Sequence, residues 1–224
     1  MLPTSSYANH TSCPRDDRDS DEDRLTNQRE CELDTDPFRA DTDGDGLIDY
    51  LEVEVHGTNP RWGDTENDRV QDRQEIESWQ TDPKNPDTDG DGISDGVELY
   101  DPPITNPLKP DTDDDGLKDG EEANVYKTHP RELDTDKDTL TDGDEVNKYN
   151  CDPIKLDTDD DGVDDGVEVR QGTDCRQSTD TDGDGLTDGA EVNTYGTSPT
   201  VSNKGDLAPS GAPNGQINVA DLLL

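Results

Sequence analysis

One acidic pattern occurs eight times in this chain of 224 residues, and it limits the possible folds more than any other feature. The copy at residues 41–52 reads DTDGDGLIDYLE, with acids at positions 1, 3, 5, 9 and 12 and glycine at position 6. The copies begin at residues 19, 41, 64, 87, 111, 134, 157 and 180. A repeat of this period predicts an array of small units, each packed on its neighbours, instead of one domain around one core.

The spacing of the acids indicates what they bind. Carboxylates this close repel one another unless a cation lies among them. The pattern matches D-x-[DN]-x-[DN]-G-x₅-E, the calcium loop of EF-hands, in which alternate side chains converge on one ion. Calcium takes six to eight oxygens, so the carbonyl at position 7 and both oxygens of the glutamate at position 12 are expected to contribute. The sequence therefore predicts about eight calcium ions, one per loop.

The candidate ligands occupy six positions in each loop. Position 1 is Asp19, Asp41, Asp64, Asp87, Asp111, Asp134, Asp157 and Asp180. Position 3 is Asp21, Asp43, Glu66, Asp89, Asp113, Asp136, Asp159 and Asp182, and position 5 is Asp23, Asp45, Asp68, Asp91, Asp115, Asp138, Asp161 and Asp184. The position 7 carbonyls belong to Leu25, Leu47, Val70, Ile93, Leu117, Leu140, Val163 and Leu186. Position 9 is Asn27, Asp49, Asp72, Asp95, Asp119, Asp142, Asp165 and Asp188, and position 12 is Glu30, Glu52, Glu75, Glu98, Glu122, Glu145, Glu168 and Glu191.

The composition excludes several classes of protein. The chain has 59 acids against 19 Lys plus Arg, a net charge of −40 and only 25% hydrophobic residues, too few to build one core of ordinary size. Of those acids 39 stand at ligand positions, a register that a disordered acidic tail has no reason to keep. The charge excludes nucleic acid and anionic membrane surfaces as partners. No run of 18 apolar residues predicts a membrane span, and the first residues do not resemble a signal peptide.

The segments between the loops repeat as well. Position 7 is always aliphatic, and breaks such as HGTNP at residues 56–60 follow each loop. We expect a short helix from about position 9 to position 16, ended by glycine or a turn residue and then proline. Positions 9, 13 and 16 share one helical face, so we expect a thin apolar strip there. Trp79 and the tyrosines at position 16 (Tyr126, Tyr149 and Tyr195) are expected to be packing residues, with a carbohydrate-binding platform as the alternative.

From about residue 10 to residue 200 the chain resembles the thrombospondin type 3 repeats, in the bacterial form DTDGDGLxDGxEvxxyGTxP. It differs from a true EF-hand in two ways: some 11 residues between loops leave no room for paired helices, and the aliphatic residue stands at position 7, not 8. The resemblance implies a solenoid-like repeat fold with little regular secondary structure, in which metal ions replace a hydrophobic core. It also implies a secreted or cell-surface protein of bacterial type.

Some loops depart from the pattern. Arg24, Arg69 and Thr139 replace glycine at position 6, and Glu66 replaces aspartate at position 3. A residue other than glycine at positive φ costs roughly 1 kcal/mol. We therefore predict a gradient of calcium affinity among the loops.

Four cysteines flank two of the loops. Cys13 and Cys31 bracket the first loop, and Cys151 and Cys175 bracket the seventh. We favour these two local disulfides, because the two other pairings span more than a hundred residues of an array. Disulfides indicate an oxidising compartment. A zinc site is the weaker alternative, since CxxC spacing is absent and only His10 lies near.

The two ends differ from the array at residues 19–201. Residues 1–18 resemble the end of a preceding repeat or a cap. Residues 202–224 contain NGQINVAD, which resembles half of a dockerin or EF-hand motif; an insertion breaks its spacing, and the alternative is a tail whose apolar end docks onto a partner. The candidate ligands there are Asp206, Asn214, Asn218, Asp221 and the carbonyl of Gln216.

These features favour a structural function over a catalytic one. The sequence offers no nucleophile motif, phosphate loop or open catalytic metal site, so we do not expect an enzyme. The first hypothesis is a calcium-rigidified stalk or spacer that supports adhesion or surface display. The alternatives are a subunit of a head-to-tail extracellular filament, an anchoring module that uses residues 202–224, and a calcium store. Calcium is the expected partner, together with a surface partner or further copies of the chain.

Overall fold

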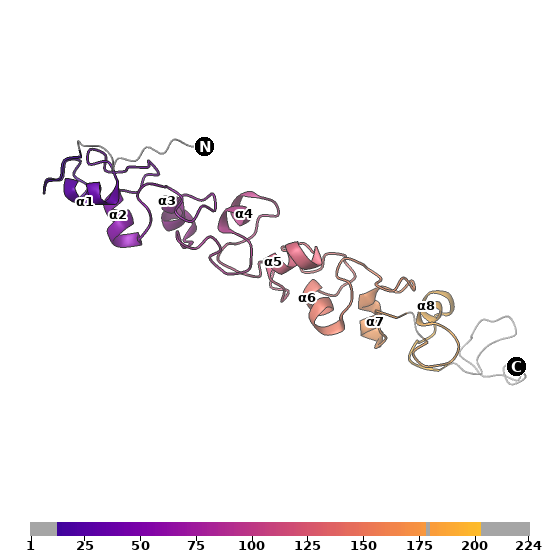
Figure 1. Ribbon diagram of the computed structural model, residues 1–224. Helices are drawn as coiled ribbons and strands as arrows, with labels where there is room; N and C mark the ends of the chain where they lie inside the picture. The colour runs from indigo at the N-terminus through magenta and orange to yellow at the C-terminus, as the bar shows by residue number, and fades with distance from the viewer. Residues whose placement is uncertain (1–12, 178–179, 203–224) are drawn as a thin grey trace, which may run out of the picture. The chain divides into compact units, whose positions relative to one another are not determined.

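The computed structural model describes residues 13–177 and 180–202, and it divides into two compact units, Met1–Pro110 and Asp111–Leu224 (Figure 1). In both units each repeat is an irregular loop followed by a short helix, and the described residues contain no β-strand. Among the helices of this part of the chain, none combines the length and apolar content needed to cross a bilayer. The predicted repeat fold with little regular secondary structure is confirmed.

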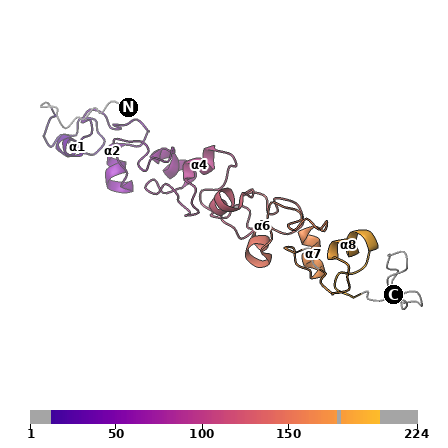
Figure 2. The same ribbon diagram turned by 45° about the vertical axis from the view of Figure 1, so that its right-hand side comes forward.

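The helices follow the loops in strict order, and Figure 2 shows the same succession from a second direction. In the first unit they are α1 (Asn27–Leu33), α2 (Asp49–Leu51) with the π-helical turn η2 (Glu52–His56), α3 (Asp72–Gln74) with η3 (Glu75–Trp79), and α4 (Asp95–Tyr100). In the second unit they are α5 (Asp119–Glu121) with η4 (Glu122–Tyr126), α6 (Asp142–Asp144) with η5 (Glu145–Tyr149), α7 (Asp165–Gln171), and α8 (Asp188–Ala190) with η6 (Glu191–Tyr195).

The predicted helix limits, positions 9 to 16, agree with these bounds. Most of the helices end at a residue in the left-handed conformation, such as Gly57 after η2 or Gly172 after α7. Gln80 and Lys127, which end η3 and η4, adopt the same backbone conformation, with φ of 64° and 67°. Helix α4 ends differently: Asp101 is extended, because the two prolines that follow disfavour continuation of the helix.

The interior consists mainly of carboxylates. The position 7 side chains of Leu25, Leu47, Val70, Leu117 and Val163 are buried, with at most 5% of their surface exposed. The position 12 glutamates are buried more deeply, at 0% or 1% exposed in all eight repeats. The expected packing role of Trp79 is wrong, because 41% of this side chain is exposed. The helices therefore turn the acidic residues at positions 9 and 12 toward the interior.

Within each unit, one hydrogen bond recurs at the same positions between each repeat and the next. Position 5 carboxylates accept a hydrogen bond from the backbone N–H at position 10 of the following repeat. The bonded pairs are Asp23–Tyr50, Asp45–Arg73, Asp68–Gly96, Asp115–Gly143, Asp138–Gly166 and Asp161–Gly189, at 2.5–3.2 Å. The carboxylate that helps to form one loop thus also holds the next helix in place.

Four repeats have a glycine at position 10 that leaves no room for a side chain. A Cβ on Gly143 would lie 2.1 Å from the backbone carbonyl oxygen of Asp115, and equivalent carbonyls stand 2.0–2.3 Å from a Cβ on Gly96, Gly166 or Gly189. These contacts are too short to be accepted without movement of the backbone.

We therefore expect Gly143→Ala to destabilise the calcium-bound chain by about 2–3 kcal/mol, because the methyl group forces two repeats apart. The matched control is Gly116→Ala, whose Cβ meets nothing within 4 Å and whose only cost, roughly 1 kcal/mol, is the positive φ of 103°. Thermal unfolding in saturating calcium, followed by circular dichroism, measures both. Equal losses for the two variants would contradict the packing explanation.

Candidate metal centres

Each loop is closed by its first aspartate, as the second repeat illustrates. The carboxylate of Asp41 accepts hydrogen bonds from the backbone N–H groups of Gly44 at 2.6 Å and Gly46 at 3.1 Å. Both glycines have positive φ, and so do the residues at positions 4 and 6 of every repeat. Asp45 accepts from the N–H of Leu47 at 2.6 Å. These bonds turn the backbone so that the carboxylates at positions 1, 3 and 5 face one point.

The carboxylates converge to metal-binding distance. In the first three repeats, ligand oxygens from positions 1, 3 and 5 all lie within 4.8 Å of one another. In the third repeat, oxygens of Glu66, Asp72 and Glu75 also form such a group. The loops thus bring together residues that the sequence predicted as ligands.

Several of these oxygens are buried without any hydrogen-bond partner. At position 12 they belong to Glu30, Glu52, Glu75, Glu98, Glu122, Glu145 and Glu168, and at position 3 to Asp21, Asp43, Glu66, Asp113, Asp136, Asp159 and Asp182. A buried carboxylate oxygen with no partner costs several kcal/mol unless a cation compensates it. Hard oxygen donors in this number and spacing fit Ca²⁺. The residues present therefore fit the predicted ion.

In most repeats two threonines hold the ligands, and sequence reasoning missed both. The threonine at position 2 donates its N–H and its hydroxyl to the two oxygens of the position 9 aspartate; for Thr42 and Asp49 the distances are 2.8 and 2.7 Å. A threonine after the helix donates to the position 12 glutamate, as Thr81 does to Glu75 at 3.0 Å. Both threonines recur in register in the sequence, which was the available signal. The two oxygens of the position 9 aspartate accept the bonds from the position 2 threonine. This side chain therefore holds the loop in shape, in addition to lying close to the other ligands.

The first and sixth loops lack the second threonine bond. Cys151 stands where other repeats have the threonine that holds position 12, and both carboxylate oxygens of Glu145 are buried without a hydrogen-bond partner. Both oxygens of Glu30 in the first repeat are in the same state. In that repeat Asn27 replaces aspartate at position 9; its amide donates to Asp16 at 2.7 Å, and its own oxygen is buried without a partner. These two loops therefore leave more carboxylate oxygens free for an ion.

Burial raises the pKa of several ligand carboxyls at positions 3 and 12, and the neighbouring acids raise it further. The pKa of Glu52 and of Glu145 rises from an ordinary value of 4.5 to about 9, and that of Glu122 to about 8, with loss of water as the largest cause. Asp43 and Asp136 at position 3 are raised to about 6 for the same reason. Without a cation, the folded loops thus favour protonated glutamates at position 12 at neutral pH.

This gives an expected pH dependence for the calcium-free chain. A glutamate whose pKa is 4.5 unfolded and about 8–9 folded stabilises the fold below pH 4.5, and this stabilisation is lost as the pH rises through 8–9. Chain stripped of calcium on a chelating resin should therefore be more compact at pH 4 than at pH 9 in circular dichroism and X-ray scattering. With calcium present the order should reverse, because protons compete with the ion for the same oxygens. A calcium-free chain equally compact across this range would contradict the burial of these carboxyls.

The replacements at position 6 keep the loop conformation and contact the next repeat. Arg24, Arg69 and Thr139 have φ of 91°, 87° and 89°. The guanidinium of Arg69 donates to the carbonyl of Gly96 at 3.0 Å and pairs with Asp101 at 2.7 Å, that of Arg24 lies 5.5 Å from the ring centre of Tyr50, and Thr139 accepts from Arg170 at 3.1 Å. These contacts offset part of the backbone strain. The affinity gradient remains a prediction.

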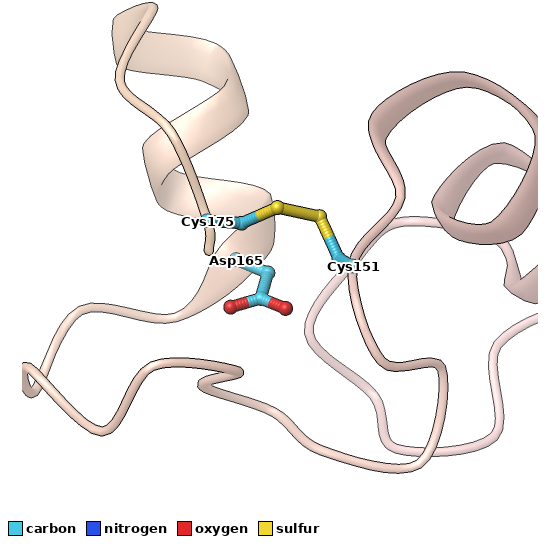
Figure 3. Close-up of side chains that lie close together, drawn as sticks. All are labelled: Cys151, Asp165 and Cys175. Atoms are coloured by element: carbon cyan, nitrogen blue, oxygen red, sulfur yellow. A yellow bond between two sulfur atoms is a disulfide. The ribbon is translucent and has the colours of Figure 1, made fainter. Parts of the chain in front are cut away.

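The two favoured disulfides are confirmed. Cys13 is bonded to Cys31 and Cys151 to Cys175, with Cα–Cα distances of 6.2 and 6.0 Å. Figure 3 shows the carboxylate of Asp165 beneath the second disulfide, between its two arms. Since both sulfurs are bonded to each other, they are not available to zinc. The C-terminal candidates Asp206, Asn214, Asn218 and Asp221, the carbonyl of Gln216 and residues 1–12 lie outside the described residues.

Comparison with known proteins agrees with this geometry. The model of the bacterial TSP3 repeat family matches residues 41–60, 87–101, 111–128, 157–174 and 180–202. These stretches match the bacterial thrombospondin type 3 repeat, the family that the sequence predicted. The matched stretches end at residue 202, and the dockerin-like motif stays a prediction. No curated protein matches the chain.

Two solved structures contain short stretches similar to this chain. One is the B domain of a biofilm associated protein, 40% identical over 20% of this chain and 11% of that chain, with a TM-score of 0.20. The other is the BSP domain of a biofilm associated protein, 42% identical over 19% of this chain and 7% of that chain, with a TM-score of 0.19. The matched stretches thus span about a tenth of each of those chains.

Proposed function

We propose that this chain is a non-enzymatic, extracellular structural segment that calcium stiffens, acting as a spacer in adhesion or surface display. The observation that carries the proposal is the buried, partnerless carboxylate oxygen at position 12, which recurs in the loops at 22 to 24 residue intervals. One ion per loop would reduce the net charge of −40 to −24. Residues at positions 1, 3, 5 and 12 and the carbonyl at position 7 would hold it.

The contacts between repeats support a spacer. The position 5 carboxylate both faces its own loop and holds position 10 of the next repeat, so an ordered loop orders the start of its neighbour. Stability then adds along the chain, repeat by repeat, as in other repeat proteins. The ion supplies what a hydrophobic core supplies in ordinary domains.

The compartment follows from the chemistry of the sites. The disulfides Cys13–Cys31 and Cys151–Cys175 require an oxidising environment. Calcium sites of extracellular modules have Kd values of about 10⁻⁴–10⁻³ M, so they fill at extracellular calcium and stay empty at the far lower cytosolic level. Both features favour an extracellular or cell-surface location.

Single-molecule stretching tests the mechanical role. With the chain tethered by its ends in millimolar calcium, we expect a series of resolved unfolding steps; in chelator, we expect the smooth extension of an entropic chain. The control is the same molecule returned to calcium, which should recover its steps. Smooth extension in calcium would contradict the proposed function as a calcium-stiffened spacer. Long fibres in calcium, seen by electron microscopy, would favour the filament hypothesis in its place.

A further inference from the structure

The loops contain many Asp–Gly dipeptides, a chemically labile sequence. Thirteen occur in the chain, and the aspartate of each stands at position 3, 5 or 9 of a loop. In an Asp–Gly dipeptide the backbone nitrogen of glycine attacks the preceding side-chain carboxyl more easily than in other dipeptides, because glycine has no side chain to hinder the approach. The residues expected to bind calcium are therefore also those most open to this reaction.

In the folded loops, hydrogen bonds hold the glycine nitrogens that would attack. The N–H groups of these glycines donate hydrogen bonds to oxygens of other residues, as seen at Gly44, Gly46, Gly90, Gly92, Gly96, Gly116, Gly143, Gly162, Gly166, Gly183, Gly185 and Gly189. Most of these acceptors are carboxylates at position 1 of the same loop or position 5 of the preceding one. A nitrogen held in this way cannot turn toward the carboxyl before it.

The carboxyls are held as well. Asp165 accepts from the N–H of Thr158 at 2.7 Å and from its hydroxyl at 2.6 Å, and Asp188 is held by Thr181 at 2.9 and 2.6 Å. At position 5, Asp161 accepts from Val163 at 2.9 Å on one oxygen and from Gly189 at 3.0 Å on the other. Neither partner of the reaction is free to approach the other while the loop is closed.

We infer that these Asp–Gly bonds are modification sites that become reactive only when a loop opens, so that loss of calcium leads to isoaspartate in the ligand positions. In the opened loop the glycine nitrogen forms a bond to Cγ of the protonated aspartate side chain; the carboxyl OH and the nitrogen's proton leave as water, giving a succinimide. Water then opens the ring. Cleavage of the new bond restores aspartate, and cleavage of the original peptide bond gives isoaspartate, with no change of oxidation state.

The product cannot rebuild the site. Isoaspartate carries the backbone through Cγ, which lengthens the main chain by one carbon and places the carboxylate on Cα. A loop whose carboxylates must meet within 4.8 Å does not tolerate this change. A temporary loss of calcium would thus leave the affected loops permanently modified. The first and third repeats contain no Asp–Gly dipeptide, so we do not expect isoaspartate in them. In both, arginine follows the aspartate at position 5, as Arg24 and Arg69.

The test compares isoaspartate in three incubations of the full chain at neutral pH: with calcium, with chelator, and with calcium plus concentrated urea. Isoaspartate is quantified by enzymatic methylation and located by mass spectrometry, and circular dichroism of each sample reports the fold. We expect about tenfold or more isoaspartate in the chelator and urea samples, since each 1.4 kcal/mol needed to open a loop reduces the open population tenfold. The third repeat serves as the internal control, without isoaspartate in any sample.

A matched variant sharpens the result. Gly92→Arg copies the arginine of the first and third repeats, at a glycine whose Cβ would meet nothing within 4 Å. In chelator it should lose isoaspartate at Asp91 and keep it at Asp89. The inference rests on the proposed function only in that calcium closes the loops. A chain still folded in chelator would refute that function. The urea sample would still test whether an opened loop forms isoaspartate. Equal isoaspartate in folded and unfolded samples would overturn the inference.

Discussion

In excess chelator at neutral pH, the chain is expected to lose its helical circular dichroism and to expand to the dimensions of an unfolded polymer. The position 12 glutamates are 0% or 1% exposed, so without an ion the fold would hold eight buried carboxylates next to further acids. With Kd of about 10⁻⁴ M and calcium of about 10⁻³ M, each ion stabilises the fold by about 1.4 kcal/mol, and eight by about 11 kcal/mol. That is the whole stability of a typical domain. Circular dichroism and small-angle X-ray scattering measure the change.

Two controls accompany this experiment. Excess calcium added after the chelator should restore both signals, which separates ion loss from damage. Magnesium at the same concentration should restore less, because it demands a smaller octahedral site and gives up its water reluctantly. A chain that stays compact in chelator at neutral pH would show that the carboxylates are not held by ions.

The substitution Glu52→Gln is expected to remove one ion and to destabilise the calcium-bound chain by about 1–3 kcal/mol. Glu52 is 0% exposed; one of its oxygens accepts from Thr58 at 3.4 Å, and the other is buried without a hydrogen-bond partner. Glutamine has nearly the same shape, but it lacks the charge and the second oxygen that calcium takes at this position. Ions bound per chain, counted by atomic emission after dialysis, and the thermal midpoint in calcium report the two effects.

The matched control is Glu54→Gln, two residues further along the same π-helical turn. Glu54 is exposed and faces Arg29 at 4.0 Å, at the limit of an ion pair, so its charge contributes little to stability. The control should keep every ion and its thermal midpoint. If both variants lost the same stability, the effect would belong to net charge and not to the site.

Much of the fold could be predicted from the sequence, because the repeat fixes it locally. The register of Asp41 to Glu52 was enough to place the loop, the helix from Asp49 to His56 and its end at Gly57. Each of these depends on contacts within about 20 residues, which one copy of the pattern specifies. The two disulfides followed for the same reason, since both close short segments of the chain.

The remaining features depend on how one repeat meets the next, or on hydrogen bonds within a loop that the acidic pattern does not specify. Nothing in the pattern shows that Asp115 must hold Gly143, or that Thr135 fixes Asp142 through two hydrogen bonds. The exposure of Trp79 was misjudged because an aromatic residue on a helix ordinarily indicates a core, and here carboxylates occupy the interior. Arg69 was taken only as a defect at position 6, whereas its guanidinium reaches the following helix.

A calcium titration of the ion-free chain, read at once by bound ions and by circular dichroism, tests the central claim most directly. We expect the helical signal to rise with the ions bound and to saturate near one ion per loop, since buried carboxylates can close around a site only when it fills. A helical signal already complete before any ion binds, or ions that bind without changing it, would show that something other than metal holds this chain together.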